Sequence, residues 1–244
     1  MPKFFVTKDN IEDNSIYIDG DDARHIARSL RMAVGDSVTV SDGEGNEYSA
    51  VLTRIRDDRV DASVTESYRS PAEPPVSITL FMAYPKGDKL ETVIQKAVEL
   101  GASRIVPFES SRCVKRPSSD KAEAKSVRLS RIALEAAKQC GRGIIPAVAL
   151  PVSFKEALAE ASDADLPLFC YEAEDGRSIK EVLDSVTSCA TVSVMVGSEG
   201  GFSPDEADAA RNAGMISVGL GPRILRCETA PDYALSAISY KFEL

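Results

Sequence analysis

The stretch VSVMVGSEGGFSPDE, residues 192–206, places an apolar segment, a glycine-rich turn and a helix start in direct succession. The run TVSVMV at 191–196 is short and β-branched, as is typical of a strand that is covered on both faces in a parallel sheet. A strand that leads through glycines into a helix forms a junction that can hold a small polar or anionic ligand. The segment therefore predicts both an α/β fold and the place of a binding site.

The turn itself is defined by its glycines and by the residues that follow them. A glycine allows backbone angles and close approaches that a Cβ would block, and the turn has three of them: Gly197, Gly200 and Gly201. Ser203 precedes Pro204 and stands three residues before Glu206, which predicts a capped helix that begins at the proline. One such turn alone leaves a purely structural role open.

A second segment, ISVGLGPRILRCETAPDY at 216–233, repeats the arrangement. It has a short strand, then Gly219 and Gly221, and later Thr229 with Asp232 three residues on, which predicts another helix cap. Turns that follow neighbouring parallel strands lie at the same edge of a sheet, where ligands of open α/β folds bind. We expect one pocket to be lined by both turns.

These segments resemble a known family when they are taken together. GSEGGFSPDE and LGPRILRCETAPDYAL are similar to the C-terminal motifs of the RsmE family, bacterial methyltransferases of the SPOUT superfamily that modify N3 of a uridine in 16S ribosomal RNA. Three further segments resemble the same family: HIARSLRMAVGD at 25–36, KGDKLETVIQKAVELGASRIVPFESSRCVKR at 86–116 and RIALEAAKQCGRGIIPAV at 131–148. The resemblance covers nearly the whole chain in the expected order.

Two domains are predicted by the pattern along the chain. Residues 4–68 are typical of small antiparallel β structure with one helix at 25–31, and the proline-rich segment 69–75 is typical of a linker. We place the domains at 1–70 and 71–244, the second with alternating strands and helices. Periodicity alone favours a doubly wound fold. The resemblance instead implies a PUA-like RNA-binding β-barrel domain, then a SPOUT-type trefoil-knotted α/β methyltransferase domain that forms a homodimer.

Length and composition narrow the class of protein. The chain has 244 residues, enough for two domains, and five cysteines without a CxxC pair, which favours neither a disulfide framework nor a zinc site. We expect no bound metal. There is no apolar run of about 20 residues and no signal-peptide core, so we expect a cytoplasmic protein without a membrane segment.

The distribution of charge bears on RNA binding. A net charge of −9 argues against indiscriminate coating of nucleic acid, yet residues 104–142 hold ten basic side chains against four acidic ones. A solvated helix face would explain that run as well. With the resemblance, we expect the RNA contacts to come from Arg24, His25, Arg28, Arg31, Arg112, Lys115, Arg116, Arg142 and Arg223. His25, the only histidine, is placed far in sequence from the predicted pocket and is given no catalytic role.

The resemblance implies S-adenosylmethionine as the methyl donor. The residues that match the family's cofactor loops are Val196, Gly197, Ser198, Glu199, Gly200, Gly201, Leu220, Gly221, Ile224, Leu225, Arg226, Thr229 and Ala230. Core packing is the alternative for the aliphatic members. We expect Lys96 and Glu99 to face either the site or the dimer partner, and the sequence does not decide between them.

Three motif residues are the candidates for catalysis. Removal of the N3 proton of uridine needs a base or a group that stabilises the developing anion. Arg226, like Arg223, is suited either to holding a phosphate or to stabilising the uridine oxygens as negative charge develops, because a guanidinium binds oxygen pairs in a bidentate way. Glu199 and Glu228 are candidate bases, although each would serve equally well to cap a helix or to pair with a cation.

Two other functions remain open, and one family feature is missing. Enzymes of the SPOUT superfamily that methylate a ribose 2′-hydroxyl share the glycine loops, and an RNA-binding assembly factor would keep the fold without turnover. The PUA-like domain and the RILRCETA segment favour the base methyltransferase. The tryptophan often found before EAAKQCGR in the family is absent here, where Ser130, Arg131 and Ile132 stand instead.

Overall fold

The computed structural model describes residues 1–114, 119–174 and 176–244, except for the side chains of residues 119–124. The chain forms two compact units, which are described separately. The first comprises residues 1–73 and also 137–145, and the second comprises 74–136 and 146–244. The sequence predicts 137–145 within the second domain, whereas the structure packs this segment with the first.

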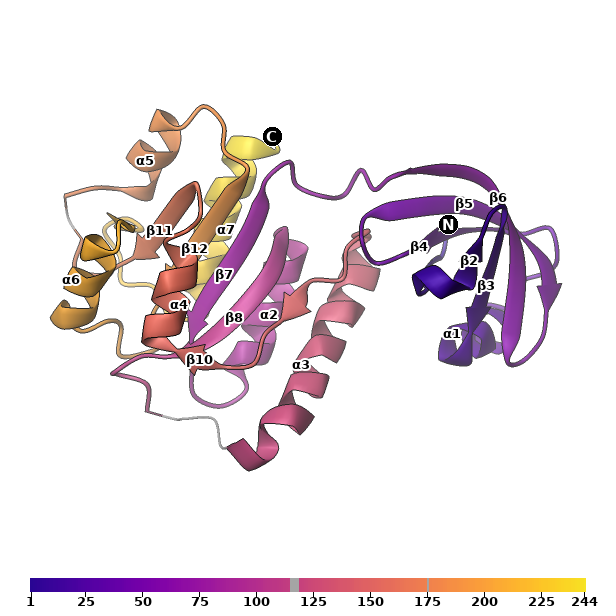
Figure 1. Ribbon diagram of the computed structural model, residues 1–244, viewed down its shortest axis with the longest axis horizontal. Coiled ribbons are helices and arrows are strands. Elements are labelled where there is room, and N and C mark those ends of the chain that lie inside the picture. Colours follow the sequence, from indigo (N-terminus) through magenta and orange to yellow (C-terminus); the bar gives the residue numbers. More distant parts are fainter. Residues whose placement is uncertain (115–118, 175) are drawn as a thin grey trace. The chain divides into compact units, whose positions relative to one another are not determined.

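The first unit is a six-stranded sheet in the order β1-β4-β5-β6-β3-β2, antiparallel except for the parallel pair β1 and β4 (Figure 1). Its strands are β1 (Lys3–Phe5), β2 (Ile11–Glu12), β3 (Ser15–Asp19), β4 (Ser37–Ser41), β5 (Asn46–Ile55) and β6 (Arg59–Arg69). Alternate residues of these strands, such as Ile16, Ile18 and Val60, are fully buried in one core. A short helix η1 (Lys8–Asn10) precedes β2.

The helix predicted over 25–31 begins earlier and ends earlier. It comprises α1 (Gly20–Arg24), which continues without a break into a wider π-helical turn, η2 (His25–Ser29). Arg31 lies beyond the helix with a φ of 52°, a left-handed conformation that seldom suits a long side chain. The predicted helix over 25–31 is therefore wrong at its last position, Arg31.

Residues 141–145 are held in the first unit by buried polar contacts. The Arg142 guanidinium is 3% exposed and its Nη2 atom lies 2.6 Å from Glu73 Oε2. The backbone amides of Gly143 and Ile144 donate to Glu73 Oε1 at 2.8 and 3.0 Å. Ser41 Oγ donates to the Gly143 carbonyl at 2.7 Å. Because these groups would be unsatisfied without one another, the segment is an integral part of the β unit.

The second unit has a fully parallel sheet in the order β10-β8-β7-β12-β11-β13, with β9 beside β8. The strands are β7 (Ser77–Ala83), β8 (Ala102–Glu109), β9 (Ala147–Val148), β10 (Val152–Ser153), β11 (Leu166–Cys170), β12 (Thr191–Val196) and β13 (Ile216–Val218). The predicted strands at 191–196 and after Met215 are confirmed. The trefoil knot that the resemblance implies stays a prediction.

Helices cover both faces of this sheet. Figure 1 shows α4 in front of the sheet, with α2 and α7 behind it. The helices are α2 (Lys89–Glu99), α3 (Ser119–Cys140), α4 (Phe154–Ala161), α5 (Ile179–Ser185), α6 (Pro204–Asn212) and α7 (Thr229–Phe242). No helix in the described part of the chain is long and apolar enough to cross a membrane.

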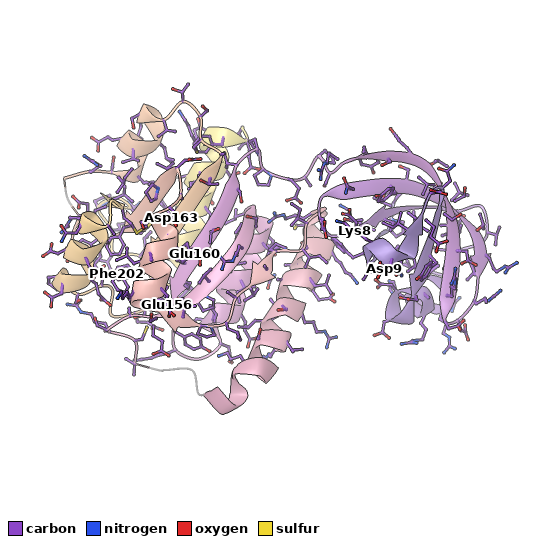
Figure 2. The ribbon with its side chains drawn as sticks, viewed as in Figure 1. Lys8, Asp9, Glu156, Glu160, Asp163 and Phe202 are labelled. Atoms are coloured by element: carbon purple, nitrogen blue, oxygen red, sulfur yellow. The ribbon has the colours of Figure 1, made fainter. Side chains whose placement is uncertain are left out.

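Phe202 anchors the glycine turn after β12 in the core of the second unit. Its ring centroid lies 4.3 Å from that of Phe169 and 6.3 Å from that of Phe108, and its side chain is 1% exposed. Figure 2 labels Phe202 beside Glu156 and Glu160 of α4, the helix whose apolar face closes this core. Since Phe202 directly follows Gly201, its burial fixes the end of the turn.

We expect Gly143→Ala to destabilise the first unit. A Cβ at this position would overlap the side chain of Ser70 and lie 2.9 Å from Glu47 Oε1. Overpacking of this kind costs about 1–3 kcal/mol. Thermal denaturation should show a lower melting temperature for Gly143→Ala and partial recovery in the double variant Ser70→Gly with Gly143→Ala, which removes the overlapping Cβ. An unchanged melting temperature in the single variant would contradict the close packing of this segment.

Candidate functional site

Three loops meet at the carboxyl edge of the parallel sheet in the second unit. β11 lies between β12 and β13, and its last residue, Cys170, is in register with both Val196 and Val218. The chain leaves all three strands at the same edge, through 197–203, 171–174 with 176–178, and 219–228. Between these loops is a cavity of about 840 Å³, within the range of roughly 300–1,000 Å³ of small-molecule sites.

Most of the residues predicted to bind the cofactor line this cavity. They are Val196, Gly197, Ser198, Glu199, Gly200, Gly201, Leu220, Gly221, Ile224, Leu225, Arg226 and Ala230. Thr229 is not among the lining residues. Arg223, which was predicted to contact RNA, also lines the cavity. The structure therefore brings the two glycine turns together, as their positions after parallel strands predict.

The third loop was missed from the sequence. It contributes Tyr171, Glu172, Glu174, Arg177 and Ser178 to the lining. Lys89, Cys170, Pro222 and Cys227 also line the cavity and were not predicted, whereas Gly219 belongs to the second turn that was expected there. The apolar run at 166–170 predicts a buried strand, and the rule that parallel strands end at one edge applies to it as well. The loop lacks glycine next to the strand end, which is the feature that marks the other two turns.

Gly201 is the position in the first turn that requires glycine. Its φ is 62°, and its amide donates to the Ser198 carbonyl at 2.9 Å, which closes the turn. A Cβ on Gly201 would overlap the Glu172 carboxylate. A Cβ on Gly197 would instead lie 3.1 Å from the backbone of Gly201, so that glycine permits the turn to fold back on itself.

The loop after β8 supports the same turn from outside. Arg112 Nη1 donates to the Gly200 carbonyl at 3.0 Å. Glu206 Oε1 accepts from the Ser111 amide at 2.7 Å. The predicted capping box of α6 is confirmed, because Ser203 Oγ accepts from the Glu206 amide and the Glu206 carboxylate accepts from the Ser203 amide. Glu206 thus joins the helix start to the loop that carries Arg112.

The second predicted helix cap is wrong. α7 begins at Thr229 itself, with Glu228 at the cap position and no side-chain hydrogen bond there. The carboxylate of Asp232, which was to complete the cap, accepts a hydrogen bond from Lys96 Nζ at 2.9 Å. The pair joins α7 to α2. Lys96 therefore has a structural partner and does not line the cavity.

The two candidate bases, Glu199 and Glu228, both form ion pairs with one lysine, Lys89. Lys89 Nζ lies 3.1 Å from Glu199 Oε1 and 3.1 Å from Glu228 Oε2. Hydrogen bonds to these carboxylates raise the pKa of Lys89 to about 12. The Cys227 thiol donates to Glu228 Oε2 at 3.2 Å, and burial together with this hydrogen bond raises the pKa of Cys227 to about 12.

Both carboxylates of the cluster are held in their charged form. Burial alone would raise the pKa of Glu199, but hydrogen bonds from backbone amides and from Lys89 outweigh it, and the pKa is lowered. Burial acts in the same direction on Glu228, where hydrogen bonds from Cys227, a backbone amide and Lys89 again leave the pKa lowered. A carboxylate with a lowered pKa is a weak proton acceptor.

The residues predicted to bind RNA are divided between the units. Arg24, His25, Arg28 and Arg31 are exposed on the first unit, where Arg24 pairs with Asp21 and Arg28 Nη2 lies 2.5 Å from Asp57 Oδ2. Arg142 is buried against Glu73 and presents no surface for RNA. Lys115 and Arg116 lie outside the described residues. Several basic side chains of the 104–142 segment are paired with carboxylates: Arg104 with Glu160, Arg128 with Glu91 and Lys138 with Asp22.

One residue that lines the cavity has an unpartnered side chain. Ser198 Oγ is buried and has no hydrogen-bond partner among the described residues. The hydroxyl itself is closed off from the cavity, so the polar groups that a ligand can reach are the backbone groups and charged side chains of the lining. The lining also offers both signs of charge, with Glu172, Glu174 and Glu199 beside Lys89, Arg177, Arg223 and Arg226. In the described part of the chain, no group of three or more metal-ligating side chains is found.

Comparison with known proteins agrees with this geometry. Residues 72–239 match the family model of an RNA methyltransferase domain, and residues 18–65 match that of an RNA methyltransferase PUA domain. The ribosomal RNA small subunit methyltransferase E of Bacillus subtilis is 36% identical over 251 residues, which span 100% of this chain and 98% of the relative. The protein of the same name from Synechocystis is 33% identical, over 90% of this chain and 71% of the relative.

A solved structure has the same fold along its whole length. It is the ribosomal RNA small subunit methyltransferase E of Neisseria gonorrhoeae bound to S-adenosyl methionine, with a TM-score of 0.82 and 30% identity. The match covers 98% of this chain and 97% of that one. The N-terminal unit is accordingly PUA-like and the parallel α/β unit is a methyltransferase domain. With two family models and full-length relatives in agreement, the chain belongs to the ribosomal RNA small subunit methyltransferase E (RsmE) family.

Proposed function

We propose that this protein transfers a methyl group from S-adenosylmethionine to N3 of a uridine in 16S ribosomal RNA of the small subunit. The observation that carries the proposal is the cavity between the three loops, which is lined by backbone groups of two glycine turns and by side chains of both charges. Relatives named for small-subunit ribosomal RNA methylation over the full chain support the substrate.

The cofactor would be held by the residues that line the cavity. Bound S-adenosylmethionine supplies an electrophilic methyl group on a sulfonium. Backbone groups around Gly197 and Gly221 can read the polar edge of its adenine, since no side chain there blocks the approach. Glu172, which lies over the glycine turn, is an acidic group of the sign that complements a sulfonium or an ammonium.

For the RNA base, the exposed arginines at the cavity are better placed than the two glutamates. Arg223 and Arg226 are exposed and line the cavity, so they can bind a phosphate or stabilise negative charge on the uridine oxygens. Glu199 and Glu228 are bound by Lys89 and have lowered pKa values. We therefore assign the rate chiefly to positioning and anion stabilisation, with Glu199 and Glu228 in supporting roles.

The remaining parts of the proposal concern partners. The first unit would dock on RNA through Arg24, His25, Arg28 and Arg31, and the second through Arg112, Lys115, Arg116 and Arg223. We propose that the protein acts in the cytoplasm as a homodimer, as the resemblance implies. Large apolar side chains that a partner copy would cover support the dimer, among them Ile224 at 82% and Tyr240 at 75% exposure.

The test of the function is methyl transfer from labelled S-adenosylmethionine to small ribosomal subunits from a strain that lacks its own enzyme of this family. Transfer RNA, free 16S ribosomal RNA and large subunits are run in parallel, and the labelled nucleoside is identified by mass spectrometry. We expect N3-methyluridine with small subunits and no label in transfer RNA or large subunits. A ribose 2′-O-methyl product, or no transfer to any substrate, would contradict the proposal.

Gly201→Ala should weaken binding of S-adenosylmethionine at least about tenfold, because a Cβ at this left-handed position would displace the Glu172 carboxylate within the cavity. Gly214→Ala is the matched control. Gly214 also has a positive φ, of 90°, but a Cβ there meets nothing within 4 Å and the residue does not line the cavity. Calorimetric titration of both variants would refute the placement of the cofactor if Gly201→Ala kept the affinity of the unaltered protein.

Replacing Arg28 and Arg31 together with alanine should weaken binding to small-subunit RNA and lower the slope of log K against log salt by about 2, roughly one for each lost phosphate contact. Affinity for S-adenosylmethionine should stay unchanged. Arg104→Ala is the control, an exposed arginine that is paired with Glu160 on the second unit. Equal losses in the control and in the double variant would show that the effect is one of general charge.

A further inference from the structure

Lys89 is the first residue of α2 and touches both cofactor loops at once. Glu199 belongs to the loop after β12, and Glu228 stands at the end of the loop after β13, next to α7. Both carboxylates lie 3.1 Å from the same Nζ atom. Glu199 Oε1 is held in addition by the backbone amide of Lys86, at 3.1 Å. A single ammonium therefore connects three segments that are distant in the sequence.

We propose that Lys89 is a positioning residue of the methyl-transfer site, which ties the two glycine-bearing loops together by bridging Glu199 and Glu228. The inference rests on the proposed function and extends it to a residue that has no assigned role. Lys89 lines the cavity, so the bridge it makes forms part of the wall. Without it, two carboxylates from different loops would face each other with no cation between them.

The other charged and titratable groups near Glu199 and Glu228 have direct partners of their own. Cys227 Sγ is the third group within reach, 3.8 Å from Lys89 Nζ, and its thiol is directed at Glu228. On the same helix, Glu91 is paired with Arg128 of α3, and Lys96 is paired with Asp232 of α7. The direct partners of these neighbours lie elsewhere, although the charge of Lys96 also acts on Glu228. Lys89 is the cation in direct contact with both carboxylates.

A direct consequence concerns the protonation of the two glutamates. An opposite charge at hydrogen-bond distance favours the ionised carboxylate, and a like charge nearby disfavours it. With Lys89 present, both carboxylates stay charged. With Lys89 replaced by methionine, the repulsion between them is no longer balanced, and one should retain a proton to higher pH. The geometry of the loops would loosen at the same time.

The experiment is a titration of the glutamate carboxyl carbons by nuclear magnetic resonance, in full-length protein with labelled glutamate, with the two resonances assigned by Glu199→Gln and Glu228→Gln. It is done for the unaltered protein and for Lys89→Met, Lys89→Arg and Lys180→Met. Lys180→Met is the control, because it removes a lysine of the second unit that is paired with Asp184 and does not line the cavity. No RNA is needed, so the result does not depend on the identity of the methyl acceptor.

We expect Glu199 and Glu228 to titrate below the ordinary glutamate value in the unaltered protein, in Lys89→Arg and in Lys180→Met. In Lys89→Met, at least one should move up by about one pH unit or more. Unchanged titration in Lys89→Met, or the same shift in Lys180→Met, would overturn the proposal. If Lys89→Met fails to fold, Glu228→Gln decides: removal of one charge should lower the Glu199 pKa further, and an unmoved Glu199 would refute the shared bridge.

Activity supplies the second readout. Methyl transfer by Lys89→Met should fall at least about tenfold in kcat, and the acid limb of its pH profile should move upward, while Lys89→Arg should retain most of the rate. Loss of rate without a change in the pH profile would mean that Lys89 only supports the fold. If the unaltered protein itself fails to methylate small subunits, the proposed function falls, and the carboxyl titration still tests the bridge.

Discussion

The parallel pairing of β11 with both β12 and β13 is the constraint on which the site depends. Because Cys170 is in register with Val196 on one side and Val218 on the other, three chain segments leave the sheet at one edge. An antiparallel strand at any of these positions would have sent its loop to the opposite edge. The three loops therefore lie next to one another, and the cavity forms between them.

The turn after β12 is then held from several sides. Phe202 is buried in the aromatic core below it, and Arg112 binds the Gly200 carbonyl from outside. Lys89 joins Glu199 in this loop to Glu228 in the next. Each contact comes from a different element, so the turn is rigid without a regular structure of its own. A preformed cradle of this kind lowers the entropy lost when a ligand binds.

Much of the second unit follows from local sequence patterns. The β-branched run at 191–196, the glycines after it and the Ser203 to Glu206 capping box are all local features, and the structure confirms the strand and the cap. The loop after β11 lacks such a local feature, and its part in the cavity follows only from strand order. Asp232 was expected to cap α7, but a lysine on another helix binds its carboxylate, and no local pattern encodes that partner.

The same limit explains Arg142 and the charged segment around it. A run of arginines and lysines indicates a basic surface only if the side chains reach solvent, and burial depends on contacts with residues far along the chain. Arg142 is buried in the first unit by its ion pair with Glu73. Arg104 is paired with Glu160, and Arg128 is paired with Glu91. The number of basic residues in the segment 104–142 is therefore larger than the number of basic side chains that are free to bind RNA.

A crystal structure of the protein grown with S-adenosylmethionine would test the central claim most directly. The account predicts ligand density between the loops at 171–174 with 176–178, 197–203 and 219–228, with polar atoms of the ligand within hydrogen-bond distance of backbone groups in the turns around Gly197 and Gly221. Density elsewhere on the molecule, or a ligand in this cavity that makes no hydrogen bond to either glycine turn, would contradict it.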